Sequence, residues 1–306
     1  MKFNTVVVTG GAGFIGSHLV DALVPIAKRV VSIDGKKIRK AWKNSGAKYK
    51  TFDIRDEDLV EECLKKEKPD VVFHLAAHIH DRESVREPLM NADYNIIGSI
   101  KVFEAARKYA KKVVFSSTGI VYGEQEPPFT LDMTPMPVTP YAISKLAGER
   151  YLAFYNKVFD LPYVALRPGN IYGPRQDASA ESGAIGIFAS RFMKGEQVFM
   201  NNDGKTTRDY LYVDDFVNAL LLSGESNITG IFNVATGIGT ETQQVYELVS
   251  EAVGVQTKPE SREEILDFPK FVHFDISEFV KRFGWKPETS LEDGVEKTVE
   301  WYRDNV

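Results

Sequence analysis

A glycine-rich turn near the start of the chain constrains the fold more than any other feature. It follows the apolar, β-branched run TVVVT at 5–9 and opens a helical pattern. Its glycines can be counted in two ways. Gly11, Gly13 and Gly16 make G-x-G-x-x-G, whereas Gly10, Gly13 and Gly16 make the wider G-x-x-G-x-x-G. Backbone N–H groups and a helix N-terminus can approach a pyrophosphate at such a turn, so the stretch predicts a dinucleotide-binding unit.

The first two-thirds of the chain alternates short apolar runs with longer helical patterns. Runs such as VVV and VVF are apolar on both faces, which is typical of strands buried in a parallel sheet. The alternation predicts an α/β fold with a doubly wound, Rossmann-like parallel sheet. The expected strands lie at 5–9, 29–34, 49–54, 70–77, 112–118 and 163–168, and the expected helices at 13–27, 57–67, 99–110 and 140–159.

The alternation stops after residue 168, where glycine, proline and polar residues become frequent. With 306 residues, the chain can hold one large α/β domain and a smaller partner. We expect a dinucleotide-binding domain over 1–168, to which segments around 208–235 return. A smaller α/β substrate-binding lobe should occupy most of 169–306.

Composition argues against several classes of protein. The net charge of −5 does not favour a nucleic-acid or membrane partner, and no apolar run approaches the ~18 residues that span a bilayer. The single cysteine, Cys63, cannot form an intramolecular disulfide. The apolar start lacks a basic segment followed by a cleavage site. These features predict a cytoplasmic protein.

Two side-chain clusters have a plain structural explanation. The basic run KKIRK at 36–40 is typical of a solvated loop. His74, His78 and His80 fall together in FHLAAHIHD. His74 ends an expected strand while the other two enter the next loop, so the three should not converge on one ion. We therefore expect no metal site.

Asp34 ends the strand that follows the glycine turn, 21 residues after Gly13. An acidic side chain at that place accepts hydrogen bonds from the adenosine ribose. Its charge also repels a 2′-phosphate, so NAD is favoured over NADP, although the basic run at 36–40 lies close by. Asp53 follows another strand and could meet the adenine edge.

A tyrosine and a lysine lie four residues apart in YAISK, at 141–145. Both would project from one face of a helix. The lysine could then sit near the phenol and lower its pKa from about 10 toward the range useful for a base. A surface Tyr–Lys pair is the plain alternative. The preceding FSSTGIVYG at 115–123, however, places hydroxyl groups at the end of an expected strand.

In this order and spacing, the chain resembles the extended short-chain dehydrogenase/reductase family. Within that family it is most similar to the nucleotide-sugar 4-epimerases of the UDP-glucose 4-epimerase type. The resemblance covers nearly the whole chain. It is carried by TGGAGFIGSH, FDIRD, FHLAAH, FSSTGIVYG, YAISK, LRPGNIYGPRQ, RDYLYVDD, NVATG and GWKPETSLEDGVEKTVEWY.

The resemblance implies roles for individual residues, with the wide glycine count as the operative one. Tyr141 would be the catalytic base, Lys145 would stabilise the phenolate, and Thr118 would hydrogen-bond the sugar hydroxyl. The implied NAD-binding positions are Gly10, Gly13, Phe14, Ile15, Gly16, Asp34, Asp53, Ile54, Leu75, Ala76, Ala77, Ser116, Tyr141 and Lys145. The implied substrate-binding positions are Thr118, Tyr141, Asn170 and Arg208, with Arg208 gripping the diphosphate.

The implied reaction is NAD-dependent epimerisation at C4 of a nucleotide-diphosphate sugar, such as a UDP-hexose, through a transient 4-keto intermediate. The family also implies a homodimer, built from the helices at about 92–109 and 140–159. Both segments carry more apolar residues than one sheet face needs.

Other functions on the same fold stay open. Related 4,6-dehydratases and decarboxylases carry acidic residues just after the catalytic threonine, where this chain has Gly119 and Ile120. An epimerase or reductase acting on a UDP-glucuronate or N-acetylhexosamine substrate fits the motifs. A non-enzymatic NAD sensor would typically lose the tyrosine or the lysine, and both are present. Many family members also carry a diphosphate-binding arginine in the region that reads EEILDFPKFVHFD at 263–275 here. Arg262 lies a few residues early, which leaves the nucleotide open.

Overall fold

The computed structural model describes residues 1–177, 183–262 and 269–305. The chain divides into two compact units. Unit 1 comprises residues 1–121, 137–167 and 217–232, and unit 2 comprises 122–136, 168–216 and 233–306. Unit 1 is therefore assembled from three separate stretches of the sequence.

The centre of unit 1 is a seven-stranded sheet in the order β11-β6-β5-β4-β1-β2-β3. The pairings from β6 to β3 are all parallel. The strands are β1 (Phe3–Thr9), β2 (Ala27–Asp34), β3 (Ala47–Thr51), β4 (Val71–His74), β5 (Val113–Ser116), β6 (Tyr163–Pro168) and β11 (Gly230–Val234). The expected doubly wound α/β fold is confirmed, and the buried run at Val6–Val8 lies at its centre.

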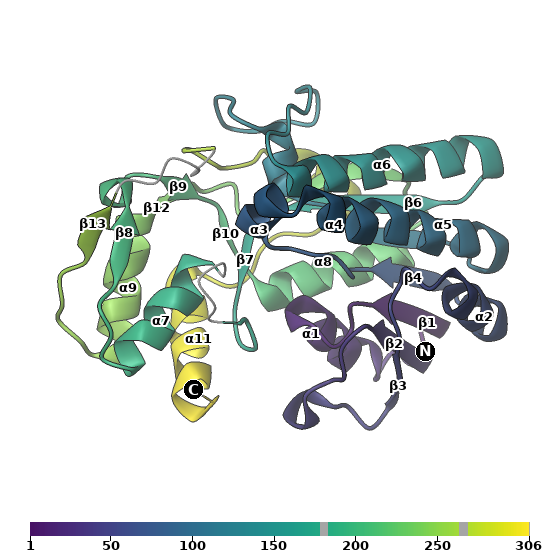
Figure 1. Ribbon diagram of the computed structural model, residues 1–306, viewed down its shortest axis with the longest axis horizontal. Helices are drawn as coiled ribbons and strands as arrows, with labels where there is room; N and C mark the ends of the chain where they lie inside the picture. The colour runs from purple at the N-terminus through teal and green to yellow at the C-terminus, as the bar shows by residue number, and fades with distance from the viewer. Residues whose placement is uncertain (178–182, 263–268, 306) are drawn as a thin grey trace. The chain divides into compact units, whose positions relative to one another are not determined.

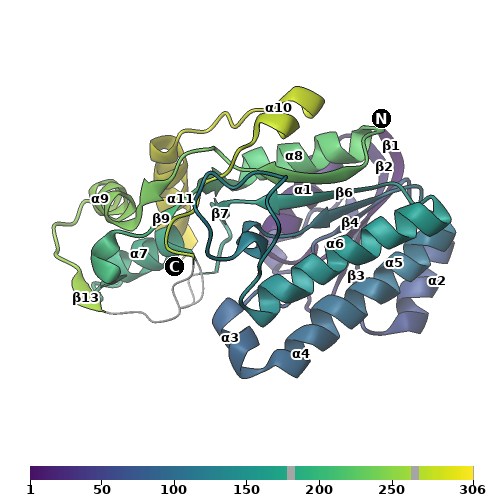
Figure 2. The same ribbon diagram turned by 90° about the horizontal axis from the view of Figure 1, so that it is seen from above.

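Helices cover both faces of this sheet (Figures 1 and 2). One face carries α2 (Glu57–Glu67), α5 (Gly98–Tyr109) and α6 (Pro140–Phe159), which share one hydrophobic core with the strands. The other face carries α1 (Phe14–Leu23) and α8 (Val213–Glu225). Gly224 of α8 packs directly on Phe73 and Phe3, since a Cβ at Gly224 would lie 2.7 Å from the Phe73 ring.

Short helices connect these elements: η1 (Lys40–Trp42), α3 (Asp81–Arg86), α4 (Pro88–Ala92), the π-helical turn η2 (Asp93–Ile97) and the 3-10 turn η3 (Gly119–Tyr122). The helix expected at 99–110 is thus the end of a longer helical stretch with a π turn inside it. The capping of α6 follows from its sequence, because the Thr139 hydroxyl accepts a hydrogen bond from Ala142 N and Pro140 occupies the first turn.

Lys112 anchors the returning segment of unit 1. Its ammonium is buried and donates to the carbonyl oxygens of Ser223, Ser226 and Ile228 at 2.7, 2.6 and 3.1 Å. These carbonyl groups lie at the C-terminal end of α8 and in the segment that leads to β11. One side chain beside β5 therefore donates to several acceptors that have no partner within the helix.

Unit 2 contains shorter elements. They are β7 (Asn170–Tyr172), α7 (Ala184–Met193), β8 (Phe199–Asn201), η4 (Asn202–Gly204), β9 (Thr207–Arg208), β10 (Tyr210–Tyr212), β12 (Thr240–Glu241), α9 (Thr242–Val253), β13 (Glu260–Arg262), α10 (Ser277–Phe283) and α11 (Leu291–Asn305). The strands pair only two by two, as β10-β7, β12-β9 and β13-β8. The buried indole of Trp285 donates to Asp215 O at 3.1 Å, and Asp215 accepts the amides of Glu288 and Thr289.

Residues 122–136 belong to unit 2, although the expected boundary put all of 1–168 in one domain. Phe129 exchanges backbone hydrogen bonds with His273 and Asp275, at 2.9 and 3.0 Å. Its ring stacks on Tyr122 and packs edge-on against Phe274. The contacts with residues 273–275 join positions more than a hundred residues apart, so no local pattern predicts them. In the described part of the chain, no helix is long and apolar enough to cross a membrane.

Candidate active site

The turn after β1 can be built only from glycine at several positions. Gly10 has φ +75°, and a Cβ there would lie 2.7 Å from Ala76 N. A Cβ at Gly16 would overlap the Gly10 carbonyl oxygen, and one at Gly11 would overlap Ser32 Oγ on β2. Gly11 is therefore needed for packing on β2, Gly10 lets the turn pass close to Ala76 after β4, and Gly16 lets α1 begin against the Gly10 carbonyl.

Asp34 is held at the end of β2, beside this turn. Its Oδ2 accepts a hydrogen bond from Ala12 N at 3.0 Å, and its Oδ1 accepts one from Lys36 N at 2.9 Å. The side chain is half-buried. Two backbone amides thus orient a carboxylate next to the glycine turn and the N-terminus of α1. This arrangement fits the ribose and pyrophosphate of a dinucleotide.

The other expected cofactor positions cluster around the same strand ends. Phe14 and Ile15 open α1. Leu75, Ala76 and Ala77 directly follow β4, where Leu75 N donates to Thr9 O and Ala76 N donates to Thr9 Oγ1. Ile54 is buried under α5, since a Cβ at Gly98 would lie 2.9 Å from its Cδ1.

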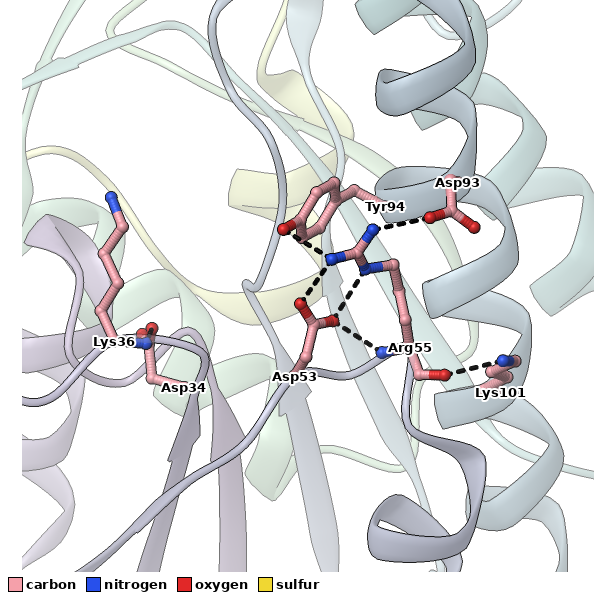
Figure 3. A network of polar contacts seen from close by, with 7 residues as sticks. All are labelled: Asp34, Lys36, Asp53, Arg55, Asp93, Tyr94 and Lys101. Atoms are coloured by element: carbon pink, nitrogen blue, oxygen red, sulfur yellow. Dashed lines mark hydrogen bonds and ion pairs between the residues drawn. The ribbon is translucent and has the colours of Figure 1, made fainter.

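Asp53 is bound by an arginine that the sequence analysis did not single out (Figure 3). Arg55 donates from Nη2 to Asp53 Oδ2 at 2.9 Å and from Nε to Oδ1 at 3.1 Å. Burial would raise the pKa of Asp53, but the hydrogen bonds from Arg55 outweigh it and hold that pKa below its usual range. Both carboxylate oxygens therefore already have a cationic partner, so contact with an adenine edge stays a prediction.

Arg55 in turn is fixed from the π turn η2. Its Nη1 donates to Asp93 Oδ2 at 2.7 Å, and its Nη2 donates to Tyr94 Oη at 2.7 Å. The guanidinium carbon lies 3.6 Å from the centroid of the Tyr94 ring. Lys101 Nζ caps the Arg55 carbonyl oxygen at 2.7 Å. Figure 3 shows the guanidinium enclosed by these groups. All of its nitrogens are committed to partners within the protein.

Tyr141 lies in the first turn of α6 and is half-buried, with the Thr118 hydroxyl beside its phenol. Its backbone N donates to Ser84 Oγ at 3.1 Å. Burial raises the pKa of the phenol, the nearby Asp81 carboxylate raises it further, and only the Thr118 hydroxyl acts in the opposite direction. The expectation that the lysine lowers this pKa is therefore wrong for the chain by itself.

Lys145 lies one turn further along α6 and is buried. Its Nζ donates to Ser116 O at 2.6 Å and lies 4.7 Å from the centroid of the Phe115 ring. Burial lowers its pKa to about 7. The ammonium is thus held against the end of β5. That explains why it does not offset the burial of Tyr141.

Asn95, also in η2, is linked to the backbone of Tyr141 through Ser144. Its Oδ1 accepts from His78 N at 2.7 Å, and its Nδ2 donates to Ser144 Oγ at 3.0 Å. Ser144 Oγ donates to Tyr141 O at 2.7 Å. The sequence does not predict the role of Asn95, because the π turn that orients its side chain has no characteristic spacing of apolar residues.

His74 and His78 have separate polar partners, and the rings of His78 and His80 lie 5.6 Å apart. Buried His74 contacts Thr9 Oγ1 at 2.6 Å and Ser99 Oγ at 2.9 Å. Burial lowers the pKa of His74 to about 3, so the ring is neutral. His78 Nε2 lies 3.1 Å from Glu83 Oε2. Among the described residues, no group of three His, Cys, Asp or Glu side chains could hold a metal ion.

Asn170 and Arg208 lie near each other in unit 2. Asn170 begins β7 and pairs with Tyr210 of β10, and its N donates to Asp209 O at 2.6 Å. Arg208 Nη1 donates to the carbonyl oxygens of Thr207 at 2.8 Å and Lys270 at 3.2 Å. Arg208 lies on β9, which pairs with β12, and directly precedes Asp209, whose carbonyl oxygen accepts from Asn170 N.

Asp209, which the sequence analysis did not select, organises this part of unit 2. The carboxylate is fully buried and accepts from Thr236 N, Thr236 Oγ1 and Gly237 N at 2.8, 2.6 and 2.9 Å. Burial raises its pKa in spite of these hydrogen bonds. The Arg-Asp pair in RDYLYVDD would have been the sequence signal, since a buried aspartate next to an apolar strand must have donors.

Many family members carry a diphosphate-binding arginine in the region that corresponds to 263–275. Residues 263–268 of this region lie outside the described residues. Arg262 is described, and its Nε donates to Asn201 Oδ1 at 2.7 Å. A cavity of about 760 Å³ in unit 2 lies along α9 and residues 287–292. Neither Asn170 nor Arg208 lines it, whereas Tyr210, the strand partner of Asn170, does.

Comparison with known proteins supports the family that the sequence motifs indicate. Residues 6–235 match the profile of the NAD dependent epimerase/dehydratase family. A UDP-glucose 4-epimerase from Mycolicibacterium smegmatis is 38% identical, over 97% of this chain and 98% of that protein.

Two solved structures are similar over nearly their whole length. A UDP-glucose 4-epimerase from Thermotoga maritima with UDP-glucose is 39% identical, with a TM-score of 0.95, over 98% of this chain and 99% of that one. A UDP-N-acetylglucosamine 4-epimerase from Methanobrevibacter ruminantium in complex with UDP-N-acetylmuramic acid is 36% identical, with a TM-score of 0.94, over 100% of both chains.

Proposed function

Since the chain belongs to the NAD dependent epimerase/dehydratase family, we propose that it inverts C4 of a UDP-hexose of the UDP-glucose/UDP-galactose type. It is an NAD-dependent nucleotide-sugar 4-epimerase. The observation in the geometry that carries the proposal is the placing of α6 against the end of β5, where Lys145 Nζ donates to Ser116 O at 2.6 Å and the Thr118 hydroxyl acts on the Tyr141 phenol. Lys145 lies one turn away on the same helix.

The residues around the glycine turn fit NAD. Gly10 and Gly16 leave no room for a side chain, α1 presents its N-terminus, and Asp34 is oriented for ribose hydroxyls. NAD, when bound, supplies a nicotinamide that accepts the C4 hydride and returns it. Arg55 cannot favour a 2′-phosphate, because its guanidinium is already bound by Asp53, Asp93 and Tyr94.

Tyr141 is the proposed acid and base of the reaction. Its raised pKa means that the phenol holds its proton in the chain by itself. Taking the proton of the sugar 4-hydroxyl therefore requires a phenolate stabilised by the Thr118 hydroxyl and by positive charge, which cationic Lys145 can provide. The same high pKa suits the return step, in which the phenol gives its proton back to the C4 oxygen.

Asn170 and Arg208 are the proposed holders of the substrate diphosphate. A guanidinium can bind two phosphate oxygens at once. Asp209 would keep the Arg208 strand and the 236–237 loop in a fixed relation, since it directly follows Arg208 and its carboxylate accepts the amides of Thr236 and Gly237. The sugar could then turn while the diphosphate stays in place.

The direct experiment is to incubate the protein with UDP-galactose and NAD and to measure UDP-glucose. Tyr141→Phe should lower kcat by about a thousandfold, the scale of general acid–base catalysis, while leaving the thermal midpoint unchanged. Full activity of this variant would rule out Tyr141 as the base.

UDP-N-acetylglucosamine is a second candidate substrate, because a UDP-N-acetylglucosamine 4-epimerase is similar over the full length of this chain. Parallel assays of kcat/KM with UDP-galactose, UDP-N-acetylglucosamine and UDP-glucuronate would rank the three. A ratio above about ten between two substrates corresponds to roughly 1.4 kcal/mol of differential binding in the transition state.

A homodimer is also proposed. The outer face of α6 exposes a helically spaced apolar stripe, with Ile143, Tyr151, Phe154 and Val158 each about half exposed. α6 lies beside α5 (Figure 1), and Ile97 and Leu89 add exposed apolar area before it. Contiguous patches of this kind mark protein interfaces. Light scattering should give twice the chain mass of 34.3 kDa, and Phe154→Glu should return the monomer.

A cytoplasmic location is proposed on two grounds. The buried Cys63 is a free thiol, which suits a reducing compartment. The substrate and cofactor proposed above are both intracellular metabolites. Fractionation of cells that express the tagged full chain would test this.

A further inference from the structure

A buried ion pair lies directly behind the proposed catalytic lysine. Glu149 follows Lys145 by one turn of α6, and its side chain is fully buried. Its Oε1 accepts from Ser117 Oγ at 2.6 Å and from Arg167 Nε at 2.9 Å, and its Oε2 accepts from Arg167 Nη2 at 2.7 Å. Arg167 of β6 is 5% exposed, so the pair is shielded from solvent.

Three consecutive residues at the end of β5 are held by three residues spaced along one face of α6. Ser116 O accepts from Lys145, the Ser117 hydroxyl donates to Glu149, and the Thr118 hydroxyl lies beside the Tyr141 phenol, whose pKa it lowers. Ser117 N also donates to Leu166 O at 2.8 Å. Glu149 is the innermost of the three helix residues. It therefore fixes the strand end from which Thr118 projects.

Glu149 also acts on the charge of Lys145. Burial lowers the pKa of Lys145, and the Glu149 carboxylate raises it again. The other titratable groups facing this site are His74 on β4, which is neutral, and Arg167 on β6, which is bound to Glu149. Tyr163 on β6 also faces Glu149, with a pKa raised by burial.

We propose that Glu149 is a positioning residue for the epimerase reaction, fixing the strand end that carries Thr118 through Ser117 and placing a buried negative charge one turn of α6 from Lys145. The inference rests on the proposed function for its consequence in catalysis. Its electrostatic part concerns the protein alone. Removing the carboxylate should therefore change Lys145 whether or not substrate is present.

The double variant Glu149→Gln/Arg167→Met tests the charge. Glu149→Gln alone would take the carboxylate partner from the buried Arg167 guanidinium and could unfold the protein, whereas removing both charges is often tolerated. Glutamine keeps an acceptor for Ser117. The titration of Lys145 is followed by the ¹³Cε shift of labelled lysine in the full chain, with its signal assigned by its loss in Lys145→Arg. We expect the midpoint to fall by about one pH unit, which is a tenfold change in the equilibrium.

The same variant should lose kcat above neutral pH, because neutral Lys145 no longer stabilises the phenolate. The alkaline limb of the kcat profile should move down by about one pH unit. The exposed pair of α10 supplies the control, so Glu278→Gln/Arg282→Met should move neither the titration nor the profile. A Lys145 midpoint equal to that of the parent would overturn the charge role, even if no epimerase activity were found with UDP-galactose.

Ser117→Ala tests the positioning role separately, because it keeps both charges. We expect kcat to fall about tenfold, the scale of one buried hydrogen bond, while KM and the pH of the alkaline limb stay unchanged. An unchanged kcat in this variant would overturn the positioning role.

Discussion

The two ends of the proposed site in unit 1 are built by different means. At the glycine turn, the geometry is set by backbone: Gly10 and Gly16 permit contacts that any Cβ would block. At the end of β5, the geometry is set by side chains from α6 and η2, with Lys145, Glu149 and Asn95 holding Ser116 to Thr118 and Tyr141. A backbone-built site is encoded within a dozen residues. A side-chain-built site exists only after distant segments have packed.

The largest effect should come from breaking the backbone-built end. Gly16→Ala places a Cβ against the Gly10 carbonyl, which cannot move away without opening the turn. We expect a loss of about 3 kcal/mol in the free energy of unfolding, as for other overpacked or strained sites. Binding of NAD, measured by calorimetry, should weaken at least about a hundredfold, since 1.4 kcal/mol is tenfold.

Gly35→Ala is the matched control for this prediction. It lies one residue after Asp34, and a Cβ there would have no heavy atom within 4 Å. Its stability and NAD affinity should equal those of the parent. If both alanine variants behaved alike, the turn would not depend on the close approach described above.

The next effect concerns the side-chain-built end and depends on pH. The pKa of Lys145 is about 7 in the folded chain and about 10.4 when unfolded, so the unfolded state binds more protons between these values. The stability contributed by the group is therefore present above the unfolded pKa and lost as pH falls through about 7. Relative to Lys145→Met, the parent should gain up to about 1.4 kcal/mol per pH unit from pH 7 to pH 10.

Urea unfolding of both proteins at several pH values would measure this slope. Taking the difference between the two proteins removes the contributions of all other titrating groups. A difference that does not vary with pH would mean that Lys145 keeps its ordinary pKa, and the contrast between the two ends would then rest on geometry alone.

The smallest effect should come from Arg55, which ties the cofactor end to the π turn that supports Tyr141. Arg55→Met frees Asp53 and removes the contacts to Asp93 and Tyr94. We expect NAD affinity to fall about tenfold, because an oriented hydrogen-bonded carboxylate is lost. Arg39→Met, which removes only the stacking on Trp42, is the control and should leave the affinity unchanged. A fall in kcat at saturating NAD would show that the two ends are energetically linked through η2.

The sequence predicts the backbone-built end well and the side-chain-built end only in part. The glycine spacing, the strand runs and Asp34 are local signals, and the structure has the strands and the turn in those places. The Tyr141–Lys145 spacing correctly puts both on one helix. It does not predict that the ammonium points to Ser116 O or that Asp81 and burial raise the phenol pKa.

The features that the sequence cannot predict are all contacts between side chains on separate segments of the chain. Arg55 acts through Tyr94 and Asp93, Asn95 acts through Ser144, and Asp209 acts through Thr236. Each pairing joins residues tens of positions apart, and each depends on a turn or strand end that has no periodicity of its own. Resemblance supplies Asn170 and Arg208 but no contact that orients them.

The three-part construction of unit 1 has a consequence for how the chain acquires its shape during synthesis. The last strand of the sheet, β11, is about 60 residues further along the chain than β6, its neighbour in the sheet. Until that stretch leaves the ribosome, the β6 edge is open, and Lys112 lacks the carbonyl oxygens of Ser223, Ser226 and Ile228. The nascent chain must therefore carry an incomplete sheet while the residues of unit 2 are translated. A fragment ending at residue 168 would remain in that state.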